Sequence, residues 1–498
     1  MKQKHIIIKD TLTYSGASYI AIIIGFIVSI YSKRFLGVSG AGYWSLLIVV
    51  MTFAGYVSLG INKGLVREVP QLVGAKEFKK AKEFENVTFA YLIIAGLAGA
   101  AVIWFISIFL ITDPSLKAGM KVISVLLLAT HLYNLMLVIL RARKQVSILS
   151  RVVVLNTLFI VVFALPGAYF FGVNGFATGT LLATFISFYS AKRLSNTSLS
   201  FNLDWAKILH LIKIGLSMFL ASILFRTFLN IDKIMIGKML DIKQLGLYTI
   251  GIMAVQQVGS LPRFFNIVIF PHIQEKYGAT KNVMDVKDMI LKPAYFVSRL
   301  MPILIGIIIF LAQPIVIFIL PQFKDGLGVM KILVLGYFFM AVNQMSASLL
   351  FTINKHKILV PLYGVMIAVC IGLNYWFITM GLGIIGVALG TAISYFLFFV
   401  VVFAIASNHI MEWSKIVRFY LEIMVFYVYF LVNVLWIDAV INFHDIILTS
   451  FAKITCFLLV SIPVLISVQR REGIFSIIYD AFKSKISSLK TSGKTVTQ

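Results

Sequence analysis

Long apolar segments are the feature that most limits what this chain can fold into. Runs of about 20 predominantly apolar residues, the length of one membrane crossing, recur from residue 12 to residue 469. Only 13% of the residues are charged, about half the fraction of a soluble domain. Backbone amides in lipid must bond within their own segment, and the polar–apolar alternation of membrane barrels is missing. We therefore predict an all-α polytopic membrane protein.

We predict 14 transmembrane helices. The first follows MKQKHIIIKD, which lacks a signal-peptide cleavage pattern, so we expect it to remain as a helix. The predicted spans are residues 12–33, 41–61, 86–111, 118–140, 148–171, 173–191, 211–235, 246–271, 294–319, 329–352, 358–380, 382–406, 416–437 and 448–468.

The net charge of +25, from 44 Lys and Arg against 19 Asp and Glu, indicates the orientation. In a soluble protein this balance would suggest nucleic acid as a partner. Here the basic residues gather in alternate loops, as they do in cytoplasmic loops, and 62–82 is the richest of these. We predict no nucleic-acid partner, and N- and C-termini that are both cytoplasmic.

Motifs for catalysis and for cofactor or metal binding are missing. The loops are too short for a catalytic domain, and neither GxxxxGK[ST] nor HExxH occurs. Cys370 and Cys456 lie in apolar runs without CxxC spacing. We predict a protein that is not an enzyme and that needs no cofactor or metal.

Two pairs of segments indicate an internal duplication. GVNGFATGT (172–180) matches GIIGVALGT (383–391) at an offset of 211, and RFLGVSGAGYWSL (34–46) matches KMLDIKQLGLYTI (238–250) at an offset of 204. Small-residue packing faces are common in membrane helices, but two matches at nearly one offset favour a repeat. The offset spans six helices, an even number, so both copies share one orientation. We predict an N-lobe (1–195), a C-lobe (205–407), two extra helices (408–469) and a basic cytoplasmic tail (470–498).

A polar stripe interrupts the seventh span. Ser222, Arg226, Asn230 and Lys233 follow helical spacing and fall on one face. An arginine near the bilayer centre costs about 2.5–3.5 kcal/mol on insertion scales, so Arg226 is expected to face water rather than lipid.

The eighth span repeats the pattern. Gln256, Ser260 and Arg263 share one face, and Pro262 frees the carbonyl of Val258, which predicts a kink. Two successive helices with aligned basic stripes predict a wet, cationic surface that suits an anionic ligand. The alternative is a structural salt bridge, in which Asp232 holds Arg226 or Arg263.

Other polar residues in the spans are weaker candidates. Asn343 is predicted to line the same cavity or to bond between helices. Arg67, in the basic loop 62–82, is predicted to meet a ligand at the inner mouth, although such a loop also suits contact with anionic lipid. Asp232 and His131 are candidates for ion coupling, and a lone buried histidine is also a common packing residue.

The chain resembles bacterial polysaccharide flippases, the O-antigen and lipid-linked oligosaccharide branch of the multidrug/oligosaccharidyl-lipid/polysaccharide exporter superfamily. The resemblance rests on LNIDKIMIGKMLDIKQLGLYTIG (229–251), LGVSGAGYWSLL (36–47), LGINKGLVREVP (59–70) and the paired GxxGxAxGT turns. Murein-precursor flippases of the superfamily also have arginines in the core of their first two spans. Arg34 and Arg67 lie nearer the span ends here, which argues against that assignment.

The resemblance implies two six-helix lobes around a central cavity with alternating access. It implies a bacterial inner-membrane protein whose cargo is an undecaprenyl-pyrophosphate-linked oligosaccharide, flipped to the outer leaflet for surface polysaccharide such as lipopolysaccharide. Membrane lipids and a glycan polymerase machinery are the expected partners, and the last two helices are expected to form a groove for the lipid tail. The resemblance places Arg226, Lys233 and Arg263 in the cavity, where guanidinium suits a pyrophosphate.

Two other functions are open. A multidrug/cation antiporter of the same superfamily would need acidic cavity residues, whereas the inferred cavity is basic. A membrane glycan polymerase would need a sizeable loop that carries acids or arginines, which is missing here.

Overall fold

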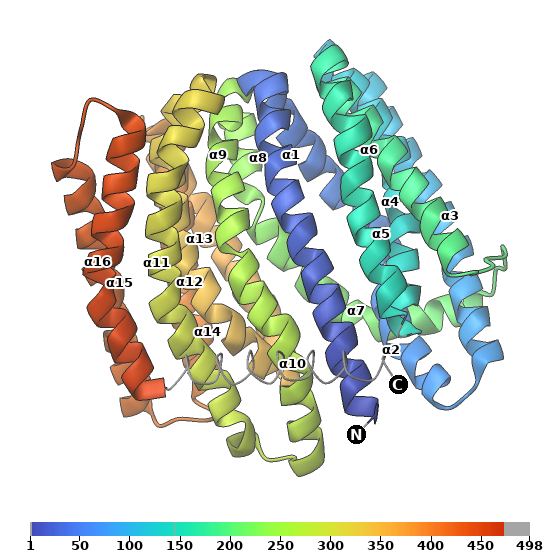
Figure 1. Ribbon diagram of the computed structural model, residues 1–498. Coiled ribbons are helices and arrows are strands. Elements are labelled where there is room, and N and C mark those ends of the chain that lie inside the picture. The colour runs from blue at the N-terminus through green and yellow to red at the C-terminus, as the bar shows by residue number, and fades with distance from the viewer. Residues whose placement is uncertain (1, 144, 473–498) are drawn as a thin grey trace, which may run out of the picture. The chain divides into compact units, whose positions relative to one another are not determined.

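Helices form the whole regular structure of residues 2–143 and 145–472, which the computed structural model describes, and no strand occurs among them (Figure 1). The helices are α1 (Lys2–Ala54), α2 (Ile61–Gly74), α3 (Phe78–Phe109), α4 (Pro114–Ala142), α5 (Val146–Phe159), α6 (Leu165–Leu194), α7 (Trp205–Phe228), α8 (Ile231–Met239), α9 (Ile242–Val258), α10 (Ser260–Thr280), α11 (Lys287–Ile319), α12 (Leu327–Thr352), α13 (Leu359–Thr379), α14 (Gly383–Ser407), α15 (Trp413–Val440) and α16 (Ile446–Glu472). Short helical turns are η1 (Gly55–Ser58), η2 (Ile160–Ala164, a π-turn), η3 (Val283–Val286), η4 (Pro321–Gly326) and η5 (His356–Ile358). From residue 473 on, the predicted basic tail lies outside the described residues.

The described residues contain 11 helical segments that are long and apolar enough to cross a membrane, so the predicted all-α polytopic membrane protein is confirmed. Two of them, Gly16–Ser58 and Val146–Leu194, each cover two predicted spans. Each contains a glycine in the left-handed region, Gly37 at φ 67° and Gly172 at φ 60°, where most side chains would be strained. The count of 14 helices remains a prediction.

The chain reverses direction at Gly172. Gly167 and Gly175, eight residues apart, lie so close that a Cβ on either would overlap the carbonyl oxygen of the other. In a straight helix eight residues span about 12 Å, so the two arms must fold back on each other.

The second copy of the motif packs in the same way. Gly383, at φ 53°, is the counterpart of Gly172 at the offset of 211. A Cβ on Gly179 would overlap the backbone of Phe163, and one on Gly390 would overlap Asn374, the residue equivalent to Phe163. The matching sequences therefore adopt matching hairpins.

One predicted span is wrong in its continuity, and the kink predicted in another is confirmed. The seventh, 211–235, breaks into α7 and α8 at Leu229 and Asn230. The Asn230 side chain donates to the Arg226 carbonyl at 2.7 Å, and an asparagine that bonds backbone in this way competes with helix continuation. The eighth, 246–271, divides at Gly259 into α9 and α10, directly after the carbonyl that Pro262 frees.

The chain divides into two compact units. Unit 1 comprises residues 1–253, 316–333 and 356–394, and unit 2 comprises residues 254–315, 334–355 and 395–498. These units are cut differently from the predicted lobes, which stay a prediction.

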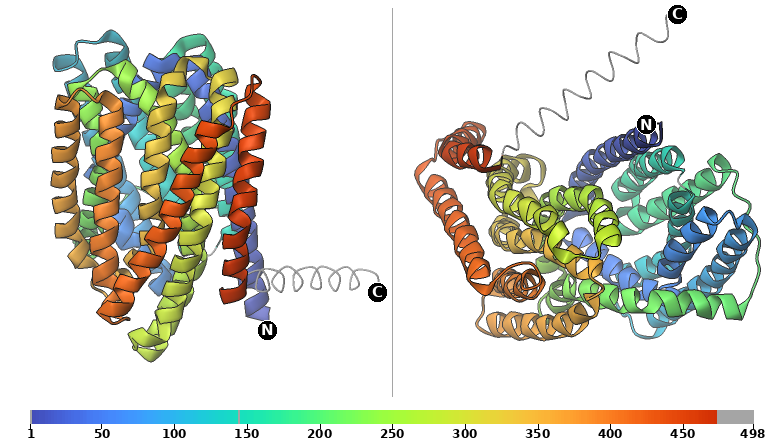
Figure 2. Two further views of the ribbon diagram at one scale, coloured as in Figure 1. Left: turned by 90° about the vertical axis from the view of Figure 1, so that its left-hand side faces the viewer. Right: turned by 90° about the horizontal axis from the view of Figure 1, so that it is seen from below.

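The core of unit 1 joins both halves of the first 253 residues. Buried side chains of α2, α3, α4 and α7 form one cluster, in which Leu65 of α2 and Leu211 of α7 are fully buried. The blue α2 and the green α7 lie side by side in this unit (Figures 1 and 2). Helix α7 is therefore anchored to helices that precede it by more than 100 residues.

Polar and aromatic contacts connect the helices of unit 2. Asn266 of α10 donates to Ser348 of α12 at 2.8 Å. The last two helices, red in Figure 2, are joined by the buried Lys453, which donates to Asp438 at 2.8 Å. Since each charge has a partner of opposite sign, this pair can be accommodated away from water.

A buried ion pair should stabilise the α3–α4 contact in unit 1. Arg143 binds the fully buried Glu85 through two nitrogens, Nε to Oε1 at 2.9 Å and Nη2 to Oε2 at 2.5 Å. We expect Glu85→Gln to lower the free energy of unfolding by about 3–5 kcal/mol, because Arg143 would lose its charged partner. Thermal unfolding of the detergent-solubilised protein measures this. Lys80→Ala, which removes an exposed pair with Glu77, should leave the midpoint unchanged, and equal midpoints for all three proteins would contradict the expectation.

Candidate functional site

Three residues of unit 1, Tyr56, Lys63 and Arg226, form what we call the Arg226 cluster. Tyr56 precedes and Lys63 follows the break between η1 and α2 at Leu59 and Gly60. The Tyr56 hydroxyl donates to a carbonyl of α7 one turn before Arg226, at 3.4 Å. The charge of Arg226 acts on both neighbours.

The two cations of this cluster influence each other electrostatically, and neither is paired with an acid among the described residues. Burial among protein atoms lowers the pKa of Lys63, and the charge of Arg226 lowers it further. Part of the Lys63 side chain remains accessible. Arg226 is exposed, and no ion pair involves it or Lys63 in the part of the chain that the structure describes. Like charges held together without a counterion favour an anionic ligand.

The predicted stripe is only partly preserved. Ser222 and Arg226 lie on α7, but Lys233 belongs to α8, so the single face is wrong beyond residue 228. Asn230 connects the two helices, because its amide donates to the Arg226 carbonyl and its oxygen accepts from Lys233 Nζ at 2.7 Å. Both ends of its side chain are thus engaged, and its role is to position Lys233 and the helix break.

Gln256, Ser260 and Arg263 form a second group, in unit 2. The exposed Arg263 donates to the carbonyls of Gly259 and Gln256, both at 2.8 Å, and so caps the backbone groups at the kink. Ser260 donates to the Gln257 carbonyl at 2.6 Å, and the Tyr337 hydroxyl of α12 lies against Gly259. Within unit 2, the described residues place no carboxylate in ion-pair range of Arg263.

Asp232 does not form the salt bridge with Arg226 that was the structural alternative. Its carboxylate accepts a hydrogen bond from the Tyr248 hydroxyl at 2.8 Å and one from the Lys233 backbone at 2.8 Å. Asp232 is 5% exposed. Arg226 therefore keeps its charge for a ligand.

Asp232 also lies within electrostatic range of a buried polar group that sequence reasoning missed. We call Asp232, Cys370, Asn374, Thr391 and Ser394 the Asp232 site, and all five are buried. Cys370 lies within electrostatic range of Asp232 and contacts the other three side chains. Asn374 Oδ1 and Thr391 Oγ1 are buried without a hydrogen-bond partner among the described residues. Such oxygens, next to a buried carboxylate, suit a small cation.

The remaining predicted residues are His131, Asn343 and Arg67. His131 is buried on α4, and its Nε2 has no partner among the described residues. Asn343 is buried on α12 in unit 2, where its Oδ1 is likewise unpartnered. Arg67 is exposed on α2, one turn after Lys63 and therefore on the same face.

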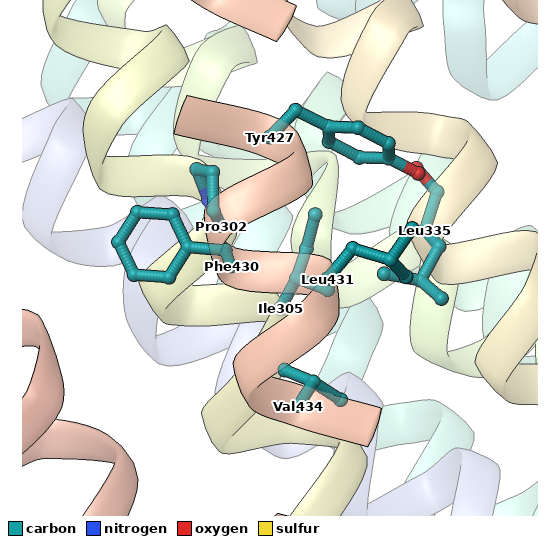
Figure 3. Close-up of a pocket in the computed structure, with 7 residues that line it drawn as sticks. All are labelled: Pro302, Ile305, Leu335, Tyr427, Phe430, Leu431 and Val434. Atoms are coloured by element: carbon teal, nitrogen blue, oxygen red, sulfur yellow. The ribbon is translucent and has the colours of Figure 1, made fainter. Parts of the chain in front are cut away.

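Unit 2 contains an apolar pocket between α11, α12 and α15 (Figure 3). Pro302 and Ile305 contribute from α11, and Leu335 contributes from α12; the face of α15 supplies Tyr427, Phe430, Leu431 and Val434. The Tyr427 hydroxyl donates to the Leu335 carbonyl at 3.3 Å, so the polar tip of the ring is satisfied. The lining suits an apolar group such as a methyl-branched chain.

Solved transporter structures share this fold at low sequence identity. The lipid II flippase MurJ in an inward closed conformation matches with a TM-score of 0.69 and 14% identity, over 92% of this chain and 99% of that one. A MOP superfamily transporter from Pyrococcus furiosus matches with a TM-score of 0.60 and 15% identity, over 80% and 95%. A MATE transporter from Vibrio cholerae matches with a TM-score of 0.60 and 12% identity, over 82% and 98%.

Sequence comparison identifies the family. No curated protein matches the chain significantly. Residues 32–322, more than half of the chain, match the polysaccharide biosynthesis protein family. This match includes the first copy of the repeat, the Arg226 cluster and Asp232. The chain is therefore a member of the polysaccharide biosynthesis protein family with the fold of the MOP transporters.

Proposed function

We propose that the protein flips a lipid-linked oligosaccharide, joined through pyrophosphate to a polyprenol such as undecaprenol, from the cytoplasmic to the outer leaflet of the bacterial inner membrane. The observation that carries the proposal is the Arg226 cluster, where Lys63 and Arg226 lie together without an acid. Membership of a polysaccharide biosynthesis family supports a glycan as cargo. The transporter fold supports alternating access as the mechanism.

The pyrophosphate is the part of the cargo that this cluster would recognise. A guanidinium binds phosphate oxygens through two parallel hydrogen bonds, and a nearby ammonium adds charge without a fixed direction. Tyr56, whose ring packs edge-on against Phe219 at 6.0 Å, offers a hydroxyl in the same region. Arg67 and Lys233 extend the positive charge along α2 and α8. Within unit 2, Arg263, Gln256, Ser260 and Asn343 are proposed as substrate contacts.

The polyprenyl tail needs an apolar surface. The pocket on α15, the first of the two extra helices, supports this role, because its lining is almost entirely aliphatic and aromatic (Figure 3). We therefore propose a tail contact between α15 and its neighbours α11 and α12, in addition to the groove between α15 and α16 that the resemblance implied.

The Asp232 site supports coupling to a cation gradient. A buried carboxylate with unpartnered amide and hydroxyl oxygens can exchange a cation as the protein changes state. His131, whose buried Nε2 has no hydrogen-bond partner among the described residues, is the second candidate for this role.

A deletion strain tests the proposed cargo. We expect the strain to lose surface glycan and to accumulate a lipid-linked oligosaccharide on the cytoplasmic face of its inner membrane, measured by lipid extraction and by protection from an added glycosidase in intact spheroplasts. A plasmid copy should restore display. Accumulation on the outer face would instead indicate a polymerase and would overturn the proposal.

The buried Asp232 is also the observation that favours a cation antiporter. Antiporters for cationic drugs need a carboxylate that the drug can reach, whereas Asp232 is enclosed by Tyr248 and α8. Increased drug resistance on overexpression, without any change in surface glycan, would support the antiporter instead.

A further inference from the structure

Two places in unit 1 bring helices of the two predicted lobes into direct backbone contact. At the first, the arm of α1 that follows Gly37 crosses α9. A Cβ on Gly42 would overlap the carbonyl oxygen of Ile242, and a Cβ on Gly246 would overlap that of Val38. Only glycine allows this approach, so we call the contact the Gly42–Gly246 crossing.

This crossing joins equivalent residues of the two repeats. Gly42 aligns with Gly246 and Val38 aligns with Ile242, both at the offset of 204. Gly42 meets Ile242, and its counterpart Gly246 meets Val38, which is the counterpart of Ile242. Such reciprocity is what a pseudo-two-fold contact between two copies gives.

The second contact, the Gly64–Gly215 crossing, joins α2 to α7. A Cβ on Gly64 would overlap the carbonyl oxygen of Leu211, and one on Gly215 would overlap that of Gly60. Ion pairs surround it, with His210 at 3.5 Å from Glu68 and Lys207 at 2.7 Å from Glu83. Among the described residues, no ion pair involves residues 38–54 or α9 at the first crossing.

The predicted topology puts the two crossings at opposite sides of the membrane. Gly42 lies at the start of the predicted span 41–61, and Gly64 follows its end. In the sequence, Tyr56 lies between Gly42 and Gly64, and Arg226 lies between Gly215 and Gly246. The cationic cluster is thus flanked by a backbone contact at each end.

We propose that the Gly42–Gly246 crossing is the outer seal of the transport route and that the Gly64–Gly215 crossing is its inner seal. The proposal rests on the transport function and on the predicted topology, but not on the identity of the cargo. A side chain at any of the four glycines would hold its seal apart. Because ion pairs reinforce only the inner seal, added volume should weaken the outer seal more.

Cysteine labelling tests the two seals separately. Ser222 lies on α7 beyond the inner crossing, and its hydroxyl bonds only the Met218 carbonyl of its own helix, so Ser222→Cys is a conservative probe. A membrane-impermeant maleimide is applied to intact cells for the outer side and to inverted membrane vesicles for the inner side. The parent protein, whose Cys370 is buried and Cys456 half-buried, gives the baseline.

Each pair of substitutions should open one side only. We expect Gly42→Val and Gly246→Val to raise labelling in intact cells about tenfold, since overpacking of this size shifts such an equilibrium by about that factor. Gly64→Val and Gly215→Val should raise labelling in inverted vesicles by a smaller factor. Gly364→Val, at an exposed glycine of α13 with nothing within 4 Å, should change neither rate.

Unchanged labelling in all four variants, or opening on the opposite sides, would overturn the proposal. If a valine variant does not insert, the alanine variant at that glycine decides, because its Cβ alone already overlaps the facing backbone. The labelling needs no glycan, so its result does not depend on whether the proposed cargo is correct. Conversely, the glycan phenotype of the deletion strain does not depend on which glycines form the seals.

Discussion

Arg226→Ala is expected to lower surface glycan at least tenfold while the protein still inserts into the membrane. A hydrogen bond to a charged group contributes about 1.5–3 kcal/mol, and Arg226 would supply two such bonds to the pyrophosphate. Lys63 cannot replace it, because an ammonium lacks the planar fork. Quantitative labelling of surface polysaccharide in the complemented deletion strain measures the effect, with protein level followed by immunoblot.

Matched variants separate recognition from loss of charge. Arg226→Lys should retain part of the activity, and Arg151→Ala, at an exposed arginine of α5, should retain all of it. Arg263→Ala should also lower surface glycan. It should in addition weaken the kink, because Arg263 caps the carbonyls of Gly259 and Gln256 there. Normal glycan display in the Arg226→Ala and Arg263→Ala strains would remove the proposed role of both residues.

Asp232→Asn is expected to uncouple transport from the cation gradient. One elementary charge that moves through a potential of 100 mV supplies about 2.3 kcal/mol, which corresponds to a roughly 50-fold accumulation ratio. The asparagine oxygen can accept from the Lys233 backbone and its amide can donate to the Tyr248 hydroxyl, so the fold around α8 should persist. Proteoliposomes with an imposed Na⁺ or H⁺ gradient measure the transbilayer ratio of the lipid-linked substrate.

Two further variants decide which group carries the cation. Asp241→Asn is the control, because this exposed residue caps the start of α9 by accepting from the Gln244 amide at 2.6 Å, a role that asparagine also fills. His131→Asn should leave the gradient dependence intact. If His131→Asn removes the dependence and Asp232→Asn does not, the coupling belongs to α4 instead.

The sequence predicted the membrane class and most of the helices correctly, because the requirement for about 20 apolar residues acts on each segment independently. Its one failure of continuity has a local cause. In 211–235 the break depends on the side chain of Asn230, whereas Pro262 had indicated the kink in 246–271. Apolar length does not record such local hydrogen bonds.

The candidate site was predicted in part for a similar reason. Arg226 stood out because a charge in an apolar run has few possible roles. Tyr56, Asn374 and Thr391 did not stand out, because single hydroxyls and amides are common in membrane helices. Thr391 does end the GIIGVALGT turn, so the repeat itself was a signal that pointed near the Asp232 site.

The sequence by itself determined that the protein is a helical membrane protein with a duplicated motif and a strong positive bias, since hydropathy, small-residue patterns and charge are properties of single segments. Only the tertiary structure decided that Asp232 binds Tyr248 rather than Arg226, that Lys63 lies beside Arg226, and that glycines of the two repeats touch. These are contacts between residues far apart in the chain, and they depend on how helices cross, which no local pattern specifies.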